Sequence, residues 1–306
     1  MRALLVVNPR ATATTPRSRD VLSRALGSDL KLDVVETRRR GHGAALAREA
    51  ALAGFDVVVA LGGDGTVNEV VNGLLADGPT PELPALAVVP GGSANVFART
   101  IGLPTDPVEA TSELLGALRA GRSRLIGLGT AGERYFTFTA GLGLDAAAVR
   151  RVERARRHGQ RPTAARYVRS AISEFYRATD RRHPAITLEL PGEAPVPGLF
   201  LGIVSNTSPW TYLGRRPVIL SPGASFETGL DLMALRRLRT TTTLRTVAAM
   251  FGERGPRGRA ILARHDEAEI SLTAARPLPL QVDGDYLGEC EQVRFRAVPN
   301  ALRVVI

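Results

Sequence analysis

Hydrophobic positions in the first 125 residues alternate between two patterns. Short apolar runs rich in valine and alanine predict buried strands at residues 2–7, 32–36, 57–61 and 85–89. Apolar residues spaced three and four apart predict helices near residues 17–26, 43–53, 66–76 and 106–120. Alternating strands and helices are typical of a doubly wound parallel sheet, in which ligands bind beyond the carboxyl ends of the strands.

The pattern changes near residue 125. Short β-like runs, separated by Pro, Gly and polar turns, lie at residues 134–140, 185–190, 199–205, 230–235, 269–273, 278–282, 292–296 and 302–306. Helical inserts are expected at 146–157, 164–177 and 241–251. Many short strands at close spacing predict an antiparallel sandwich or a curled sheet. We therefore expect two domains, an α/β domain at 1–125 and a β-sandwich-like domain with helical inserts at 126–306.

The composition limits the cellular compartments in which the protein is expected. Of the 306 residues, 44% are hydrophobic, which is enough for two buried cores. No apolar run approaches the roughly 18 residues that a membrane span needs, and the apolar start of the chain is too short for a signal peptide. Cys290 is the only cysteine, so an intrachain disulfide and a cysteine-based zinc site are both excluded. These features favour a cytoplasmic protein.

The net charge of +10 comes almost entirely from arginine, since Lys31 is the only lysine. A positive surface suits nucleic acid, an anionic bilayer or phosphorylated substrates. Nothing in the sequence resembles a zinc finger, an RNA-recognition motif or a helix-turn-helix, so nucleic acid is the least supported partner.

The most informative segment is 57–73, where a β-branched run ends in Gly62-Gly63-Asp64-Gly65 and a helical pattern begins at Thr66. Glycines let backbone N–H groups approach phosphate oxygens, and a helix N-terminus favours negative charge. Asp64 would repel those phosphates unless a cation lay between them, which points to Mg²⁺. Asp-Gly is also a hairpin signal, but the apolar residues that follow recur at helical rather than alternating spacing.

Two further segments add to this picture. A second glycine cluster, Gly91-Gly92-Ser93-Ala94-Asn95, follows the next predicted strand, and Asp283-Gly284-Asp285 forms a distant acidic turn. With these motifs, with Asn8-Pro9, with Thr37 to Gly43 and with Gly62 to Gly73, the chain resembles the diacylglycerol kinase catalytic-domain family of bacterial lipid kinases, related to sphingosine kinases. The resemblance covers nearly the whole length and implies a nucleotide-binding domain followed by a β-sandwich.

The resemblance also implies roles for residues. It identifies ATP and Mg²⁺ as cofactors, with Asp64 holding the metal and Asp285 accepting the proton of a lipid hydroxyl where the family has glutamate. The expected ATP contacts are Asn8, Thr37, Gly62, Gly63, Asp64, Gly65, Thr66, Asn68 and Ser93. The expected activity is phosphorylation of a primary hydroxyl on diacylglycerol or a related lipid. The expected partner is lipid at an anionic membrane surface, with which the protein would associate peripherally. No nucleic-acid partner is expected, and a homodimer is compatible with the sequence.

Three positions depart from the family pattern. Val96 and Gly127 stand where many members have aspartates of a water–Mg²⁺ network. Thr228, in the run Ser225 to Leu230, occupies the aspartate position of a structural Mg²⁺ site. We therefore expect no structural Mg²⁺ there, unless Glu227 compensates.

Several alternatives stay open. NAD kinase shares Gly-Gly-Asp-Gly-Thr, although the residues that follow it here favour lipid kinases. The departures at Val96 and Gly127 also allow a catalytically weakened homologue that binds lipid or nucleotide, and a nucleic-acid binder is the weakest alternative. The arginines of the helical insert predict either a solvated face or a headgroup-binding surface; they are Arg150, Arg151, Arg154, Arg156, Arg157, Arg161, Arg166 and Arg169.

Overall fold

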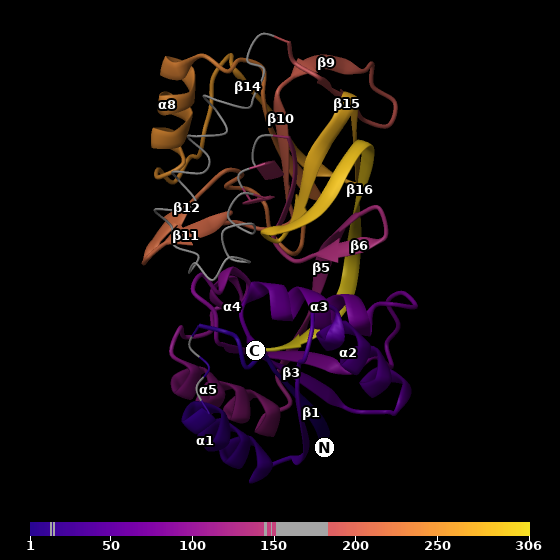
Figure 1. The fold of residues 1–306 in the computed structure, drawn as a ribbon, viewed down its shortest axis with the longest axis vertical. Coiled ribbons are helices and arrows are strands. Elements are labelled where there is room, and N and C mark those ends of the chain that lie inside the picture. The colour runs from indigo at the N-terminus through magenta and orange to yellow at the C-terminus, as the bar shows by residue number, and fades with distance from the viewer. Residues whose placement is uncertain (13, 15, 144–145, 148, 151–182) are drawn as a thin grey trace. The chain divides into compact units, whose positions relative to one another are not determined.

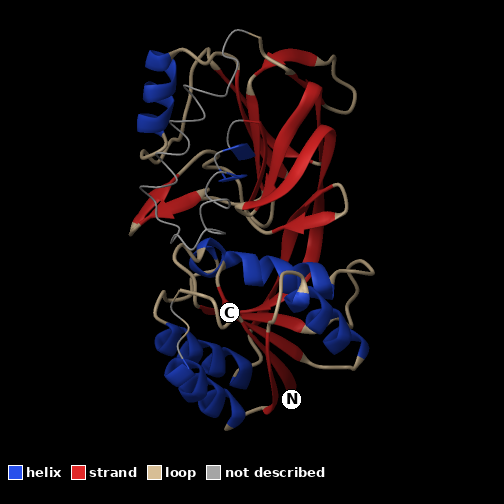
Figure 2. Ribbon diagram, viewed as in Figure 1, coloured by secondary structure: helices blue, strands red, loops and turns tan. Residues whose placement is uncertain are grey.

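The structure is a computed structural model that describes the chain except residues 13, 15, 144–145, 148 and 151–182 (Figure 1). It divides into two compact units. Unit 1 comprises residues 1–128 and 299–306, and unit 2 comprises residues 129–298. Both are mixtures of helix and strand, but strands dominate unit 2 (Figure 2).

Unit 1 is built on a parallel sheet in the order β2-β1-β3-β4. Its strands are β1 (Arg2–Val7), β2 (Lys31–Glu36), β3 (Val57–Gly62) and β4 (Ala85–Pro90). Five helices connect them: α1 (Pro16–Gly27), α2 (His42–Leu52), α3 (Asp64–Leu74), α4 (Val96–Thr100) and α5 (Pro107–Arg119). Helices α1 and α5 pack together, as do α2 and α3 (Figure 1). The predicted α/β class with a parallel sheet is confirmed.

The core of unit 1 follows from the apolar runs. Every residue of β3 and β4 is buried, as expected for central parallel strands that are covered on both faces. Strand β2 is different: it was predicted to be buried, yet most of its residues are exposed. The reason is its position, because β2 pairs only with β1 and forms the edge of the sheet. Lys31 lies on this edge, where a charged side chain discourages pairing with another chain.

Unit 2 is built on antiparallel strands in the order β14-β13-β10-β7-β15-β16, with β8 paired to β15 and β9 to β8. The longer strands are β7 (Thr139–Gly143), β10 (Leu201–Ser205), β13 (Leu230–Leu235), β14 (Ile261–Glu267), β15 (Glu269–Val282) and β16 (Asp285–Val305). The shorter ones are β6 (Arg134–Phe136), β8 (Ile186–Glu189), β9 (Val196–Leu199), β11 (Thr211–Leu213) and β12 (Arg216–Val218). Strand β5 (Ser123–Ala131) pairs with β6, and helix α8 spans Thr240–Ala249.

Two long strands replace four short predicted runs. The runs at 269–273 and 278–282 belong to one strand, β15, and the runs at 292–296 and 302–306 both belong to β16. Asp283 and Gly284 form the turn between these strands, with φ of 48° and 79°. Positive φ at both central residues is the geometry for which Asp-Gly is favoured in hairpins.

The last eight residues lie in unit 1, although the sequence pattern placed them in the second domain. The end of β16 runs parallel to β4, with Val304 opposite Leu86. The strand therefore extends the parallel sheet and buries Leu302 and Val304. A short apolar run carries no information about which sheet it will join, so the pattern alone could not show this return.

Two of the three predicted helical inserts, 146–157 and 164–177, lie wholly or largely outside the described residues. The third is observed as α8. No helix in the described part of the chain is both long enough and apolar enough to cross a membrane.

Candidate active site

The loops of unit 1 that carry the predicted nucleotide contacts all lie at the carboxyl edge of its sheet. Val7 is opposite both Glu36 and Leu61, and Gly62 is opposite Pro90. Backbone hydrogen bonds carry this register into the loops: Asn8 N donates to Leu61 O (2.9 Å), Thr37 N to Val7 O (2.8 Å) and Gly91 N to Gly62 O (2.7 Å). The structure therefore brings the four predicted loops of unit 1 together.

The two glycine loops touch through their backbones. A Cβ atom on Gly92 would lie 2.6 Å from the Cα of Gly63, and one on Gly62 would lie 2.5 Å from Thr66 Oγ1. Gly63 is similarly restricted, since its Cβ would lie 3.1 Å from the Cα of Gly92. These glycines are needed for the loops to approach each other, a reason that is independent of any ligand.

Asn95 closes the second loop. Its amide oxygen accepts from Gly92 N and its amide nitrogen donates to Gly92 O, both at 2.9 Å. The residue has φ of 48°, a left-handed conformation that Asn tolerates better than most residues. Ser93 lies exposed within the loop that Asn95 closes.

Asp64 joins the two loops. It is the first residue of α3, and its Oδ1 accepts from the backbone N–H of Phe97, 3.1 Å away in α4. Gly63 occupies the N-cap position and has no side chain with which to cap the helix. The first turn of α3 therefore presents backbone donors and a partial positive charge beside a fixed carboxylate.

Side chains around this turn also have structural partners. Asn8 Nδ2 donates to Thr66 Oγ1 (2.9 Å), so Asn8 anchors the start of α3. Asn68 is 1% exposed, and its Oδ1 accepts from Asn72 Nδ2 at 3.2 Å. These two residues were predicted as ATP contacts. Asn68 thus contacts another side chain of α3, and contact of either residue with ATP stays a prediction.

Glu69 was missed as an individual position by sequence reasoning. Its carboxylate accepts from Gly41 N (2.7 Å) and from Gly43 N (2.9 Å). It thus ties the Thr37–Gly43 turn to α3. The available signal was a carboxylate one helical turn after Gly65, on the same helix as the glycine loop.

The loops fit a magnesium–nucleotide complex better than a free metal ion. Among the residues that the structure describes, no three His, Cys, Asp or Glu side chains are grouped to hold a metal. Mg²⁺ in kinases is commonly bound by one or two carboxylates together with substrate phosphates and water. Asp64 would supply the carboxylate, and the nucleotide would supply the other charged ligands.

The two aspartates of the acidic turn in unit 2 differ in burial. Asp283 is 5% exposed and accepts four hydrogen bonds, from Thr137 N (2.8 Å), Thr137 Oγ1 (2.9 Å), Phe138 N (3.0 Å) and Thr139 N (3.1 Å). It therefore fixes the hairpin turn to the segment that leads into β7. Asp285 is half-buried and begins β16, directly after the turn. The role of Asp285 toward a lipid hydroxyl stays a prediction.

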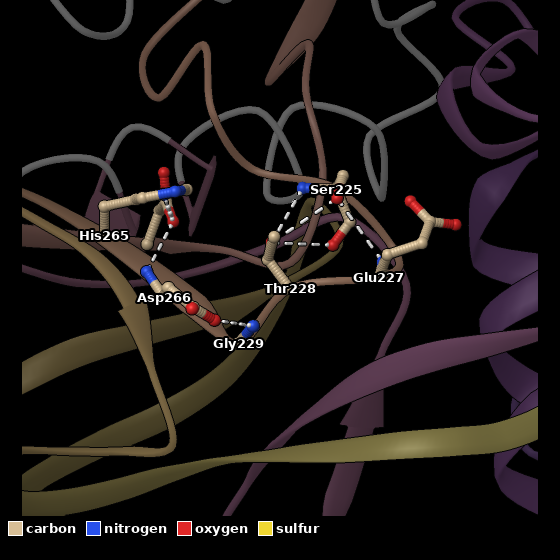
Figure 3. Close-up of polar contacts among 7 residues, drawn as sticks. Ser225, Glu227, Thr228, Gly229, His265 and Asp266 are labelled. Carbon is tan, nitrogen blue, oxygen red and sulfur yellow. Dashed lines mark hydrogen bonds and ion pairs between the residues drawn. The ribbon is translucent and has the colours of Figure 1, made fainter.

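The turn at 225–229 is closed by hydroxyl groups (Figure 3). Thr228 Oγ1 donates to Ser225 O (3.1 Å) and accepts from Ser225 N (3.3 Å). Gly229 N donates to Asp266 Oδ1 at 2.6 Å, which attaches the turn to β14. Thr228 thus holds the turn through hydrogen bonds, and Glu227 contributes its backbone N–H to Ser225 Oγ (3.4 Å). The expectation that no structural Mg²⁺ binds here stays a prediction.

Val96 and Gly127, the two departures from the family's aspartates, lie in regular elements of the structure. Val96 is 1% exposed and begins α4, so it belongs to the apolar core of unit 1. Gly127 lies in β5. Neither supplies a carboxylate to the site.

The fold and site define a kinase with two units, the first carrying glycine loops and the second a β-sandwich-like sheet. Residues 2–129 match the family described as "Diacylglycerol kinase catalytic domain", and residues 139–306 match the "YegS C-terminal NAD kinase beta sandwich-like domain". The chain belongs to the diacylglycerol kinase catalytic-domain family, which confirms the resemblance inferred from its motifs.

Two curated proteins illustrate the relationship. "Probable lipid kinase YegS-like" of Chromohalobacter salexigens is 40% identical over 142 residues, which is 46% of this chain and 44% of that protein. The diacylglycerol kinase of Bacillus subtilis is 27% identical over 248 residues, 79% of this chain and 75% of that protein. The match to the first protein therefore spans less than half of its length.

Solved structures show the same fold. A diacylglycerol kinase from Bacillus anthracis str. Sterne superposes with a TM-score of 0.72 at 18% identity, covering 99% of this chain and 96% of that one. An NAD kinase from Archaeoglobus fulgidus, solved in complex with ATP, superposes with a TM-score of 0.55 at 15% identity, covering 100% and 94%. The predicted second domain of β-sandwich type is confirmed by these matches and by the family assignment.

Proposed function

We propose that the protein is an ATP-dependent lipid kinase that phosphorylates a primary hydroxyl of diacylglycerol or a related lipid. The observation that carries the proposal is the junction of the two glycine loops, with Asp64 at the uncapped N-terminus of α3. This arrangement offers backbone donors to phosphate oxygens and a carboxylate to Mg²⁺. The names of the relatives support a lipid acceptor.

Phosphoryl transfer depends mainly on positioning and charge neutralisation. In the proposed reaction, the loops of unit 1 would orient the triphosphate, and Asp64 would hold a Mg²⁺ ion, which when bound would supply positive charge to the phosphates. Asp285 would accept the proton of the lipid hydroxyl as the hydroxyl oxygen bonds to the γ-phosphorus of ATP and the bond from that phosphorus to ADP breaks. General-base assistance of this kind contributes about 10²–10⁴-fold to the rate.

Ser93 offers the cleanest test of the nucleotide site, because its side chain is exposed and a substitution leaves the loop packing intact. Ser93→Glu places a negative charge where phosphates are expected and should weaken ATP binding at least tenfold, roughly 1.4 kcal/mol. Ser112→Glu, an exposed change in α5, is the matched control. Calorimetric titration with Mg-ATP measures both. Equal affinities in the two variants and the parent would remove the site assignment.

The acceptor is tested with labelled ATP against diacylglycerol, sphingosine, ceramide, phosphatidylinositol and NAD. Transfer to NAD instead of lipid would favour the NAD kinase alternative, whose fold neighbour makes it the second candidate. ATP binding without transfer to any acceptor, at a rate equal to that of Asp64→Ala, would favour a catalytically weakened homologue.

A further inference from the structure

Helix α8 (Thr240–Ala249) has its polar and apolar faces reversed relative to an ordinary surface helix. Leu244 and Val247 are 65% and 46% exposed, and Ala248 beside them is exposed as well. Their spacing of three and four residues places them on one face of the helix. A surface helix normally turns such a face toward the core.

The less exposed positions of α8 carry threonines. Thr246 is buried and Thr243 is half-buried. Their hydroxyls are satisfied within the helix, since Thr246 Oγ1 donates to Thr242 O (3.0 Å) and Thr243 Oγ1 to Arg239 O (3.1 Å). Back-bonding of this kind lets threonine pack inward without an unsatisfied hydroxyl. Leu238 and Met250, which flank the helix, contribute the apolar anchors to a core cluster of unit 2.

Positive charge is concentrated in the segment that contains α8. Seven exposed arginines lie between residues 236 and 259, against Glu253 as the one acidic residue of that segment. They are Arg236, Arg237, Arg239, Arg245, Arg254, Arg257 and Arg259. Within the described part of the chain, none of the seven takes part in an ion pair. Arg150 contrasts with them, because it is paired with Glu289 at 2.5 Å.

We propose that this α8 surface, made of Leu244, Val247, Ala248 and the seven arginines, docks on an anionic phospholipid bilayer. Exposed apolar side chains in a segment rich in basic residues are typical of helices that lie in a membrane interface. Two large apolar side chains give little insertion energy by themselves, so the charge has to contribute. The inference rests on the proposed function, because a lipid kinase meets its acceptor at such a surface.

The test measures sedimentation with vesicles of phosphatidylcholine alone or mixed with phosphatidylglycerol, without nucleotide, at low and high salt. The parent should bind the anionic vesicles and lose binding as salt rises. Arg245→Glu should weaken the partition by about fivefold or more, the effect of one basic residue at such a surface. The double variant Leu244→Ser with Val247→Ser should weaken it by about tenfold.

Two exposed changes elsewhere serve as matched controls. Leu52→Ser removes a leucine that is 77% exposed on α2, and Arg276→Glu reverses an exposed arginine on β15. Both should bind vesicles like the parent, and circular dichroism should show all variants folded. Equal losses in the controls and the α8 variants, or a parent that does not distinguish anionic from neutral vesicles, would overturn the proposal. A parent that ignores vesicles but binds an acidic protein through Arg245 would overturn it in favour of a protein partner.

Kinase assays with detergent-dispersed lipid separate this inference from the proposed function. The α8 variants should keep the parent rate there, since none of the changed residues belongs to the glycine loops or the acidic turn. One outcome would separate the two proposals. If the parent phosphorylates no lipid, but the α8 variants bind anionic vesicles more weakly than the parent does, the docking surface is supported and the proposed activity is refuted.

Discussion

Asp283 and Asp285 lie two residues apart but meet different surroundings. Asp283 satisfies four donors of the 137–139 segment, whereas Asp285 stands half-buried at the start of β16. Asp283→Asn would put an NH₂ group against backbone donors and should cost about 3 kcal/mol of unfolding free energy. Asp285→Asn should cost less, because Asp285 is half-buried rather than buried. Urea denaturation measures both.

Kinetic measurements test the proposed role of Asp285. Asp285→Asn should lower kcat by about 10²-fold or more while ATP affinity stays unchanged, since the lost interaction forms in the transition state. Asp285→Glu, which restores the family's residue, should keep substantial activity. Parent-like kcat in a folded Asp285→Asn variant would place the base elsewhere or show that none is needed.

Thr228 provides a test of metal dependence. Its hydroxyl makes two hydrogen bonds with the backbone of Ser225, which close the turn without a charged ligand. The melting temperature of the parent should therefore be the same in EDTA and in Mg²⁺, in the absence of nucleotide. Thr228→Ala should lower stability by about 1 kcal/mol, the net value of a typical hydrogen bond. A melting temperature that falls in EDTA for the parent, but not for Glu227→Gln, would show that Glu227 holds a cation.

At the scale of elements, Gly73, the last residue of the Gly62–Gly73 motif, lies where α3 packs closely against α2. A Cβ there would lie 2.1 Å from Ala44 O, so α2 and α3 could not keep their distance. Gly73→Ala should destabilise unit 1 by about 3 kcal/mol. Gly116→Ala in α5 is the matched control, because no atom lies within 4 Å of its Cβ position. It should stabilise by about 1 kcal/mol, and thermal denaturation should show shifts of opposite sign.

The elements that the sequence predicted well are those with a strong local signal. The central strands β3 and β4 and the helices α1, α2, α3 and α5 follow directly from apolar spacing, and the strand–glycine loop–helix at 57–74 is present as predicted. Strand β14 was missed, because its residues Ala-Arg-His-Asp-Glu look like a polar connection. The long strands β15 and β16 were split, because Arg276 and Pro277 separate the two runs of β15, and Pro299 and Asn300 separate those of β16.

The candidate site shows the same limit. The placement of Asp64 and Ser93 in glycine loops at the carboxyl edge of the sheet was predictable, since each loop directly follows a buried strand, whereas their contacts with Mg²⁺ and ATP stay predictions. Contacts between distant segments were not: the hydrogen bonds of Glu69 with Gly41 and Gly43, and those of Asp283 with 137–139, depend on which turns the fold brings together. Sequence spacing carries no record of such pairings.

At the scale of the whole molecule, the chain leaves unit 1 after residue 128 and returns to it at residue 299. The returning end of β16 pairs with β4 and buries Leu302, Val304 and Val305, each at most 3% exposed. Burial of three such side chains contributes about 5 kcal/mol, which approaches the full stability of many domains. A nucleotide-binding unit cut at residue 128 would lack this strand.

Deletion of residues 299–306 should therefore destabilise unit 1 and abolish ATP binding, although none of the deleted residues belongs to a glycine loop. Unit 2 keeps its own core, so limited proteolysis should degrade residues 1–128 before residues 183–298. Arg303→Ala is the control, because Arg303 is exposed and the strand stays in place. ATP affinity and melting temperature like those of the parent in the deleted chain would show that β4 tolerates an open edge and that the returning strand is dispensable.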